Sequence, residues 1–178
     1  EGMMISAMDQ VRTLWGQDGG SVPILFNIND NFYGMGGQTH GETMGYDMVA
    51  RIAAGVLPSA MHAERVDGYN PLSVADAILR KREILEKGDG PVLLDTVTYR
   101  YSGHSPSDQS SYREKEEVAS WQEIDPIVCF GRSLVDAKVC DAAAIEGLTR
   151  RAEELLVKAL SKAADLKVSP RANLKKMN

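Results

Sequence analysis

Short apolar runs alternate with longer helical patterns along the chain, and this alternation constrains the fold more than any other feature of the sequence. Residues 23–28 and 91–98 are largely apolar runs of strand length, and residues 61–66 are expected to form a further strand that ends at Asp67-Gly68. Residues 46–56 and 70–87, which lie between these strands, are typical of helices. Parallel strands need a crossover of a dozen or more residues, and helical crossovers cover both faces of the sheet. The sequence therefore predicts an α/β fold, a parallel sheet with helices on both faces.

Capping residues and apolar spacing predict where the helices begin and which faces they bury. Asn70-Pro71 starts one helix, because a proline at the first helical position loses no needed hydrogen bond. Asp125-Pro126 starts another, and Asp141 caps a long helix that reaches about residue 166. The inward residues are expected to be Leu72, Ala75, Ile78, Leu79 and Ile84 in the helix after Asn70, and Ile145, Leu148, Ala152, Leu155, Leu156 and Ala159 in the long one. Residues 1–168 are expected to belong to one domain, and the polar residues 169–178 to form a tail or linker.

Residues 1–15 predict an amphipathic helix, with Met4, Met8, Val11 and Trp15 on its apolar face. Asp9 and Arg12 interrupt the apolar run, so we expect neither a signal peptide nor a membrane span. The helical pattern begins with almost no capping sequence before it, and we therefore expect a cut chain.

Composition excludes some classes of partner. The net charge of -5 and the pI near 5.2 leave no basic face for a phosphate backbone, so no nucleic-acid partner is expected. The two cysteines, Cys129 and Cys140, have neither the spacing of a zinc site nor that of a disulfide framework. A cytoplasmic location is expected, or the mitochondrial matrix if the source is eukaryotic.

The first candidate site is NDNFYGMG, residues 29–36, directly after a predicted buried strand. Ligands of open parallel sheets bind at the carboxyl ends of the strands, and a turn there directs side-chain and main-chain oxygens toward one point. Oxygen ligands suit magnesium. The alternative is an ordinary turn in which asparagine and glycine supply left-handed conformations.

The second candidate site, residues 99–108, follows the third predicted strand and sets His104 among hydroxyls, an arginine and a carboxylate. These groups hold anionic ligands and transfer protons near neutral pH. The alternative is a surface loop with a solvated histidine. Residues 113–117 are interpreted as a solvated helix start. Residues 102–111 are expected to be poorly ordered, because their serines, glycine and proline offer little to bury.

These motifs, taken in order, resemble a known family. NDNFYGMG, then ERVDGYN at residues 64–70, PVLLDTVTYRYSGHSPSDQSSYR at residues 91–113 and a downstream DPI are similar to the α subunits of thiamine-diphosphate-dependent 2-oxo acid dehydrogenases, in the carboxy-terminal half. The resemblance covers about residues 1–130. It implies a thiamine-diphosphate-binding fold that is incomplete at its amino-terminal side.

The resemblance also implies roles for three residues. Asn31, through its side chain, and Tyr33, through its main chain, match the family's magnesium ligands, and His104 matches a loop histidine near the cofactor's diphosphate and the reacting carbon. Ser105 occupies the place that is phosphorylated in mitochondrial relatives. Two departures stand out. Asp30 replaces the first asparagine of the usual pair, and the family's Gly-Asp-Gly turn, which supplies a metal aspartate, is absent.

The implied activity is oxidative decarboxylation of a small 2-oxo acid, with thiamine diphosphate and magnesium as cofactors and transfer of the acyl group to a lipoyl group. The implied partners are a β subunit and a lipoyl-bearing acyltransferase, and this chain alone is expected to hold only part of the site and to be inactive. Two alternatives remain open. One is another thiamine enzyme of the transketolase type, and the other is a non-catalytic scaffold half that packs a partner subunit.

Overall fold

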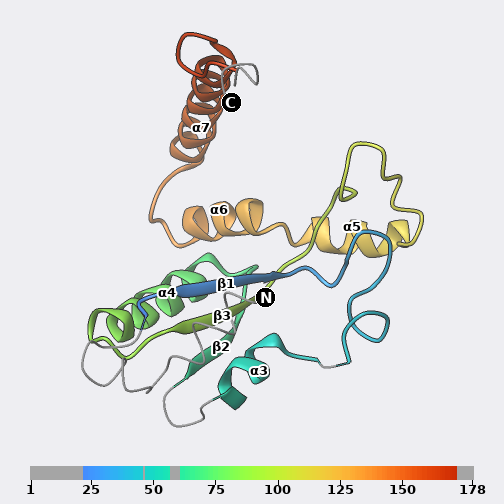
Figure 1. Ribbon diagram of the computed structural model, residues 1–178. Coiled ribbons are helices and arrows are strands. Elements are labelled where there is room, and N and C mark those ends of the chain that lie inside the picture. Colours follow the sequence, from blue (N-terminus) through green and yellow to red (C-terminus); the bar gives the residue numbers. More distant parts are fainter. Residues whose placement is uncertain (1–21, 46, 57–60, 172–178) are drawn as a thin grey trace. The chain divides into compact units, whose positions relative to one another are not determined.

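A computed structural model describes residues 22–45, 47–56 and 61–171 and places a three-stranded parallel sheet at its centre. The strands are β1 (Leu25–Asp30), β2 (His62–Asp67) and β3 (Val92–Val97), in the order β1-β3-β2 (Figure 1). Both outer strands pair in parallel with β3. The predicted α/β class is therefore confirmed, while the helix predicted for residues 1–15 lies outside the described residues.

Helices α3 (Val49–Val56) and α4 (Pro71–Glu86) cover opposite faces of this sheet (Figure 1). Successive residues of a strand point to opposite faces. On β3, Leu93 packs in one apolar cluster with Ala50 and Ala53 of α3, and Leu94 packs in another with Ala77 of α4. Residues 92–96 of β3 are all buried, as expected for the central strand of a sheet with two covered faces.

Helix α4 begins where the sequence predicts, but it buries a different face. The Asn70 side chain accepts hydrogen bonds from the main-chain N–H groups of Leu72 and Ser73, with Pro71 at the first helical position. The predicted stripe is wrong, because Leu72 is 65% exposed and Leu79 60%. The sheet-facing residues are instead Val74, Ala77 and Lys81. Lys81 is tolerated there because its ammonium group pairs with Glu64 of β2 at 2.9 Å, while its alkyl stem packs. Of the other predicted residues, Ala75 and Ile78 are exposed and Ile84 is half-buried.

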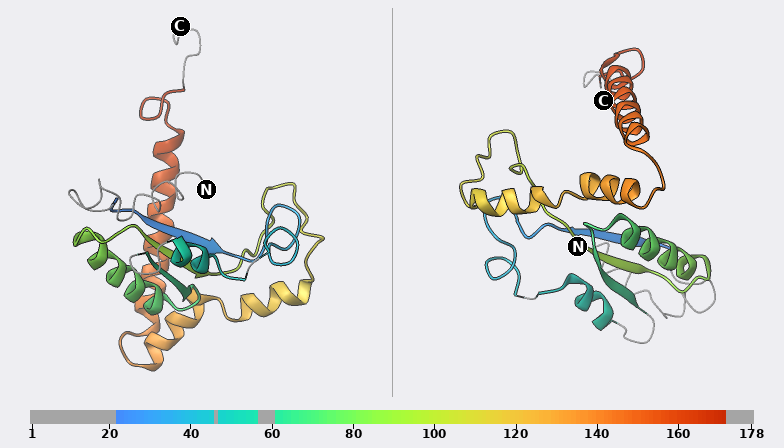
Figure 2. Two further views of the ribbon diagram at one scale, coloured as in Figure 1. Left: turned by 60° about the horizontal axis from the view of Figure 1, so that its bottom comes forward. Right: turned by 180° about the vertical axis from the view of Figure 1, so that it is seen from behind.

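The loops that follow β1 and β3 leave the sheet at the same end. The two strands are paired from Leu25 with Val92 to Asp30 with Val97, so both chains leave the sheet at the same level. In two views turned relative to each other, the blue loop after β1 and the yellow-green loop after β3 lie side by side next to α5 (Lys115–Glu123) (Figures 1 and 2). Both candidate motifs therefore start at the carboxyl end of the sheet.

The chain forms two compact units, Glu1–Val128 and Cys129–Asn178. The second unit contains most of α6 (Pro126–Asp136) and all of α7 (Ala142–Ala164), and Asp141 caps α7 by accepting from the Ala144 N–H at 2.8 Å. Only Ile145 of the predicted inward residues is partly buried. The prediction is wrong for the other five residues, which are exposed: Leu148, Ala152, Leu155, Leu156 and Ala159. In this unit, α6 is the one other helix that the structure describes, so little is available to cover them.

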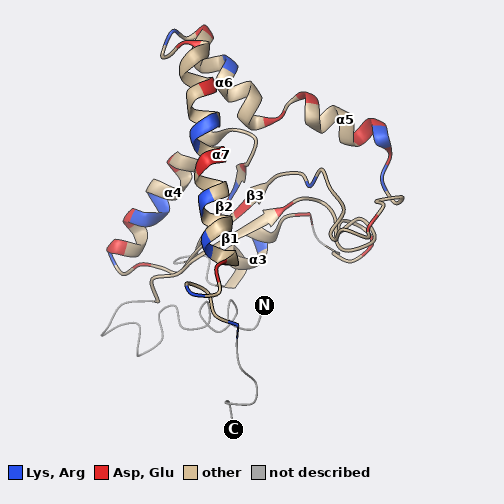
Figure 3. Cartoon of the chain, turned by 90° about the horizontal axis from the view of Figure 1, so that it is seen from above, with Lys and Arg blue, Asp and Glu red and all other residues tan. Residues whose placement is uncertain are grey.

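Helices α4 and α7 carry acidic and basic residues interspersed along their length (Figure 3). Among the described residues, the helices are too short or too polar to cross a membrane. The predicted boundary between a domain of residues 1–168 and a polar tail remains a prediction, since only residues 169–171 of that tail fall within the described part of the chain.

Candidate active site

Two direct hydrogen bonds join the loop after β1 to the loop after β3. The Thr98 N–H donates to the Asp30 carbonyl at 2.8 Å, and the Arg100 guanidinium donates to the Gly34 carbonyl at 3.0 Å. The second bond spans the two sequence motifs, which are separated by more than sixty residues in the chain. The motifs are therefore one connected structure.

The turn after β1 is built by two consecutive side-chain caps. Asp30 Oδ1 accepts from the Phe32 N–H at 3.3 Å, and Asn31 Oδ1 accepts from the Tyr33 N–H at 3.1 Å. Phe32 has a φ of 65°, a left-handed conformation that is uncommon for a bulky residue and is found most often at functional sites. The Tyr33 carbonyl accepts no hydrogen bond from the residues that the structure describes. This oxygen is therefore available to a ligand, as is one lone pair of Asn31 Oδ1.

In the loop after β3, Asp108 is the common acceptor. Its Oδ2 receives the His104 main-chain N–H at 2.9 Å and the Tyr112 hydroxyl at 2.7 Å, and its Oδ1 receives the Ser110 N–H at 2.8 Å. These hydrogen bonds, that of Tyr112 foremost, hold the pKa of Asp108 well below its usual range. Asp108 is therefore ionised at neutral pH.

The same carboxylate fixes the imidazole of His104. Asp108 Oδ2 lies 2.7 Å from His104 Nδ1, and because an ionised carboxylate only accepts, Nδ1 carries the proton. Nε2 makes no hydrogen bond with the residues that the structure describes, and the side chain is 35% exposed. Gly103 makes this geometry possible, because a Cβ at this position would collide with the main-chain oxygen of Asp108. His104 is consequently an oriented group with one nitrogen open to the surroundings.

Arg113 anchors the base of this loop. Its guanidinium donates to the carbonyls of Arg100, Tyr101 and Ser102 and to Ser110 Oγ, and the residue is only 7% exposed. The interpretation of residues 113–117 as a solvated helix start is therefore wrong for Arg113. The expectation that residues 102–111 are poorly ordered remains a prediction. The error at Arg113 arises because most of its acceptors are main-chain carbonyls, which sequence patterns do not display.

An aromatic cluster around Glu117 of α5 connects the two loops. The Tyr33 hydroxyl donates to Glu117 at 2.8 and 2.9 Å, and the Tyr99 hydroxyl donates to it at 3.0 Å. Trp121 stacks on Tyr99 with ring centroids 5.1 Å apart. Burial, followed by the hydrogen bond to Glu117, raises the pKa of Tyr33 to about 12. The phenol is thus neutral and donates to the carboxylate.

Comparison with known proteins identifies the family. The family model described as the dehydrogenase E1 component matches residues 18–171. The chain belongs to the dehydrogenase E1 component family. It is 30% identical over 172 residues to the pyruvate dehydrogenase E1 component subunit alpha type I, mitochondrial, of Ascaris suum. The aligned residues make up 96% of this chain and 40% of that protein. It is 28% identical over 150 residues to the pyruvate dehydrogenase E1 component subunit alpha of Rickettsia conorii, with 84% and 43% covered. The chain thus spans less than half the length of these curated relatives, and the resemblance to 2-oxo acid dehydrogenase α subunits is confirmed.

Asp30, which departs from the family's asparagine pair, forms an ion pair with Arg65 in this E1 component chain. Arg65 of β2 donates to Asp30 Oδ2 at 2.5 Å and also lies 3.6 Å from Asp95 of β3. Asp30 is 8% exposed and Asp95 is fully buried. The added carboxylate at position 30 is therefore committed to Arg65, and the neighbouring Asn31 keeps its own turn.

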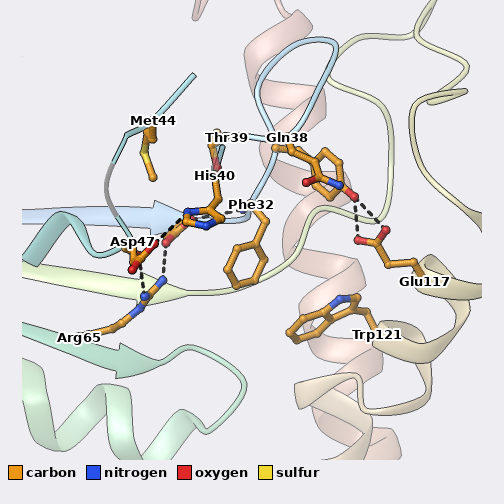
Figure 4. Close-up of a pocket in the computed structure, with 11 residues that line it drawn as sticks. Phe32, Gln38, Thr39, His40, Met44, Asp47, Arg65, Glu117 and Trp121 are labelled. Carbon is orange, nitrogen blue, oxygen red and sulfur yellow. Dashed lines mark hydrogen bonds and ion pairs between the residues drawn. The ribbon is translucent and has the colours of Figure 1, made fainter. Parts of the chain in front are cut away.

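A cavity of about 500 Å³ lies beside the Asn31 turn of the E1 component chain (Figure 4). Phe32 lies between two groups of side chains, with His40, Asp47 and Arg65 on one side and Trp121 and Glu117 on the other (Figure 4). The other residues that line the cavity are Asp30, Tyr33, Gln38, Thr39 and Met44. The volume is in the range of small-molecule sites. The cavity therefore joins the turn after β1 to α5, and both carry residues of the aromatic cluster.

The three predicted site residues occupy one end of the sheet. Asn31 and Tyr33 share a turn, and His104 is linked to that turn through Asp108, Tyr112 and Arg100, each bonded to the next. Asn31 Oδ1 and the uncommitted Tyr33 carbonyl are hard oxygen donors of the kind that Mg²⁺ prefers. No cluster of three or more His, Cys, Asp or Glu metal ligands occurs among the described residues, so the two oxygens fit a metal that takes its other ligands from elsewhere.

Arg113, Glu117 and Trp121 were not singled out by sequence reasoning. Their one sequence signal is the concentration of tyrosines in an otherwise polar loop, since three of the chain's six tyrosines are Tyr99, Tyr101 and Tyr112. Such a concentration indicates a packed loop with hydroxyl groups that need acceptors. The acceptors themselves come from α5.

Proposed function

We propose that this chain is part of the decarboxylating component of a 2-oxo acid dehydrogenase, which uses thiamine diphosphate and Mg²⁺ and passes the acyl group to a lipoyl group. Family membership and the names of the relatives support this class. The observation that carries the proposal is the connected pair of loops, in which Asn31 Oδ1, the Tyr33 carbonyl and the oriented imidazole of His104 occupy the carboxyl end of one sheet. The transketolase alternative has no support from the family match.

Asn31, through Oδ1, and Tyr33, through its carbonyl, would hold the Mg²⁺ that accompanies the cofactor's diphosphate. When bound, thiamine diphosphate supplies the carbanion chemistry that breaks the carbon–carbon bond of the 2-oxo acid. The left-handed Phe32 and the two side-chain caps hold the turn before the metal arrives, which lowers the entropy lost on binding. The contribution of this chain to cofactor binding is therefore a preorganised pair of oxygen ligands.

His104 holds or moves a proton near the reacting carbon. With Nδ1 protonated and donating to Asp108, Nε2 accepts a proton or, once protonated, donates to developing negative charge. Asp108 stabilises the protonated ring in the second case, as a carboxylate partner does in other histidine dyads. Arg113 and Gly103 keep this dyad in place.

The partners in this proposal are a β subunit that completes the cofactor site, a lipoyl-bearing acyltransferase that receives the acyl group, and a small 2-oxo acid. The enzyme acts in the cytoplasm, or in the mitochondrial matrix if it is eukaryotic. The 178 residues alone are inactive in this account, because they supply only two of the metal's ligands.

The test uses the full-length α subunit coexpressed with its β subunit. Carbon dioxide release from pyruvate and from branched-chain 2-oxo acids is measured with and without thiamine diphosphate and Mg²⁺. Release that requires both cofactors is the expected result. An assembly that forms but decarboxylates none of these acids would support the alternative of a non-catalytic scaffold half.

A further inference from the structure

Glu117 is a carboxylate in an unusual setting. It lies half-buried on α5, facing the aromatic rings of Tyr33, Tyr99 and Trp121, and both of its oxygens accept from the Tyr33 hydroxyl. Burying a charged group is unfavourable unless it is well hydrogen-bonded. An apolar residue would fill the same space more cheaply, so packing alone does not explain a glutamate at this position.

The hydrogen bonds of Glu117 determine where Tyr33 can lie. Tyr33 is 6% exposed, its hydroxyl is held by Glu117, and the Arg113 guanidinium lies over its ring at 5.4 Å. At its main chain, the N–H donates to Asn31 Oδ1, while the carbonyl accepts nothing from the described residues. The side chain is therefore fixed at its far end and the backbone at its amide, while the carbonyl is unbonded among the described residues.

Glu117 also joins the two loops that carry the site. Tyr33 comes from the loop after β1, and Tyr99 comes from the loop after β3, which also holds His104. Their rings meet edge to face with centroids 6.0 Å apart. One carboxylate on α5 thus holds a residue from each loop, which makes the separation of the loops depend on this group.

We infer that Glu117 is a positioning residue for the metal: by holding the Tyr33 side chain, it fixes the main-chain oxygen of Tyr33 that binds Mg²⁺. This inference rests on the proposed function, since it assumes that the Tyr33 carbonyl is a metal ligand. It predicts that Glu117 affects metal affinity more than turnover at saturating metal. Groups that orient metal ligands typically change metal affinity by about 10- to 100-fold when removed.

The test measures metal binding directly in the assembled enzyme. Mn²⁺ replaces Mg²⁺ as the probe, and its free concentration is followed by electron paramagnetic resonance in the presence of thiamine diphosphate. Glu117→Ala and Tyr33→Phe each weaken Mn²⁺ binding about 10-fold or more, and the double variant is no weaker than the worse single one, because both remove the same contact. Glu117→Gln, which retains an accepting oxygen, restores part of the affinity. In both Glu117→Ala and Tyr33→Phe the loss is larger in Mn²⁺ affinity than in turnover at saturating Mg²⁺.

Glu116→Ala is the matched control, since Glu116 is the exposed neighbour on the same helix, and it leaves Mn²⁺ affinity unchanged. Wild-type affinity in both Glu117→Ala and Tyr33→Phe would overturn the inference while leaving the proposed function intact. A lower melting temperature of the cofactor-free Glu117→Ala assembly with unchanged Mn²⁺ affinity would show a purely structural role and overturn it as well. Absence of cofactor-dependent Mn²⁺ binding in the wild type would instead contradict the proposed function.

Discussion

Replacing Asp108 with asparagine tests how the loop after β3 controls His104. Asp108 accepts four hydrogen bonds, three of them at Oδ2 from the His104 main chain, the His104 ring and Tyr112. An asparagine has one accepting oxygen and one donating nitrogen, so at least one donor is left facing another donor. It also lacks the charge that selects the Nδ1-protonated form of His104.

The size of the effect follows from these contacts. A hydrogen bond to a charged acceptor is worth roughly a factor of 10 to 100, and Asp108→Asn removes one or two of them. Turnover should therefore fall on the order of 10²- to 10³-fold. His104→Ala, which removes the reacting group, should lower turnover by about 10²- to 10⁴-fold.

The assay is a double-mutant cycle on the assembled enzyme, with turnover of a 2-oxo acid and a thermal melt for each variant. If Asp108 acts through His104, the double variant is no slower than His104→Ala, and all melts stay close to wild type because both residues lie in a loop. Turnover of Asp108→Asn within threefold of the wild type would refute the reasoning. So would a double variant whose loss equals the product of the two single losses.

Three further predictions concern the anchors of the fold. Arg113→Met leaves the carbonyls of Arg100 and Tyr101 without their donor, so amide exchange in residues 101–112 should speed up by about 100-fold, a loss of about 3 kcal/mol, while the exposed Lys115→Met leaves it unchanged. Gly103→Ala forces the loop away from the main-chain oxygen of Asp108 and should lower turnover as Asp108→Asn does, whereas wild-type turnover would mean the loop adapts. The hydrogen bond from Arg80, foremost, lowers the pKa of Glu64 from its usual 4.5 to about 2, so its stabilisation is complete above about pH 4.5 and is lost as the pH falls toward 2. After solvent screening, Glu64→Gln should remove on the order of 1–2 kcal/mol of the change in unfolding free energy between about pH 2 and pH 4.5, measured by urea denaturation. An unchanged pH dependence of the unfolding free energy would exclude Glu64 as its source.

The order of strands and helices could be predicted because its signals are local. Strand-length apolar runs, the Asn70-Pro71 start and the Asp141 cap each specify their own element, and the structure has those elements at those places. The buried face of α4 could not be predicted in this way. Its inward Lys81 reads as a surface residue until Glu64 of β2 is placed opposite, and that pairing depends on tertiary structure.

In the candidate site, too, the residues with local sequence signals could be predicted and those held by tertiary contacts could not. Asn31, Tyr33 and His104 come from contiguous motifs that follow strands, and the structure brings both motifs to one end of the sheet. Their roles toward metal and substrate remain predictions. Glu117 and Arg113 were interpreted as part of a solvated helix start. The bond of Glu117 to Tyr33 joins residues 84 positions apart, and several partners of Arg113 are main-chain oxygens. Long-range hydrogen bonds leave no periodic trace in a sequence.

The central claim is that the turn after β1 supplies metal ligands for the cofactor's diphosphate, and one calorimetric titration tests it most directly. Thiamine diphosphate is titrated into the assembled enzyme with Mg²⁺ present, and Asn31→Ala is compared with Asn29→Ala, an exposed asparagine two residues earlier on β1. We predict that Asn31→Ala weakens binding by at least about 10-fold, the loss expected for a charge-assisted contact, while Asn29→Ala binds as the wild type does. Equal affinity in Asn31→Ala and the wild type would contradict the account.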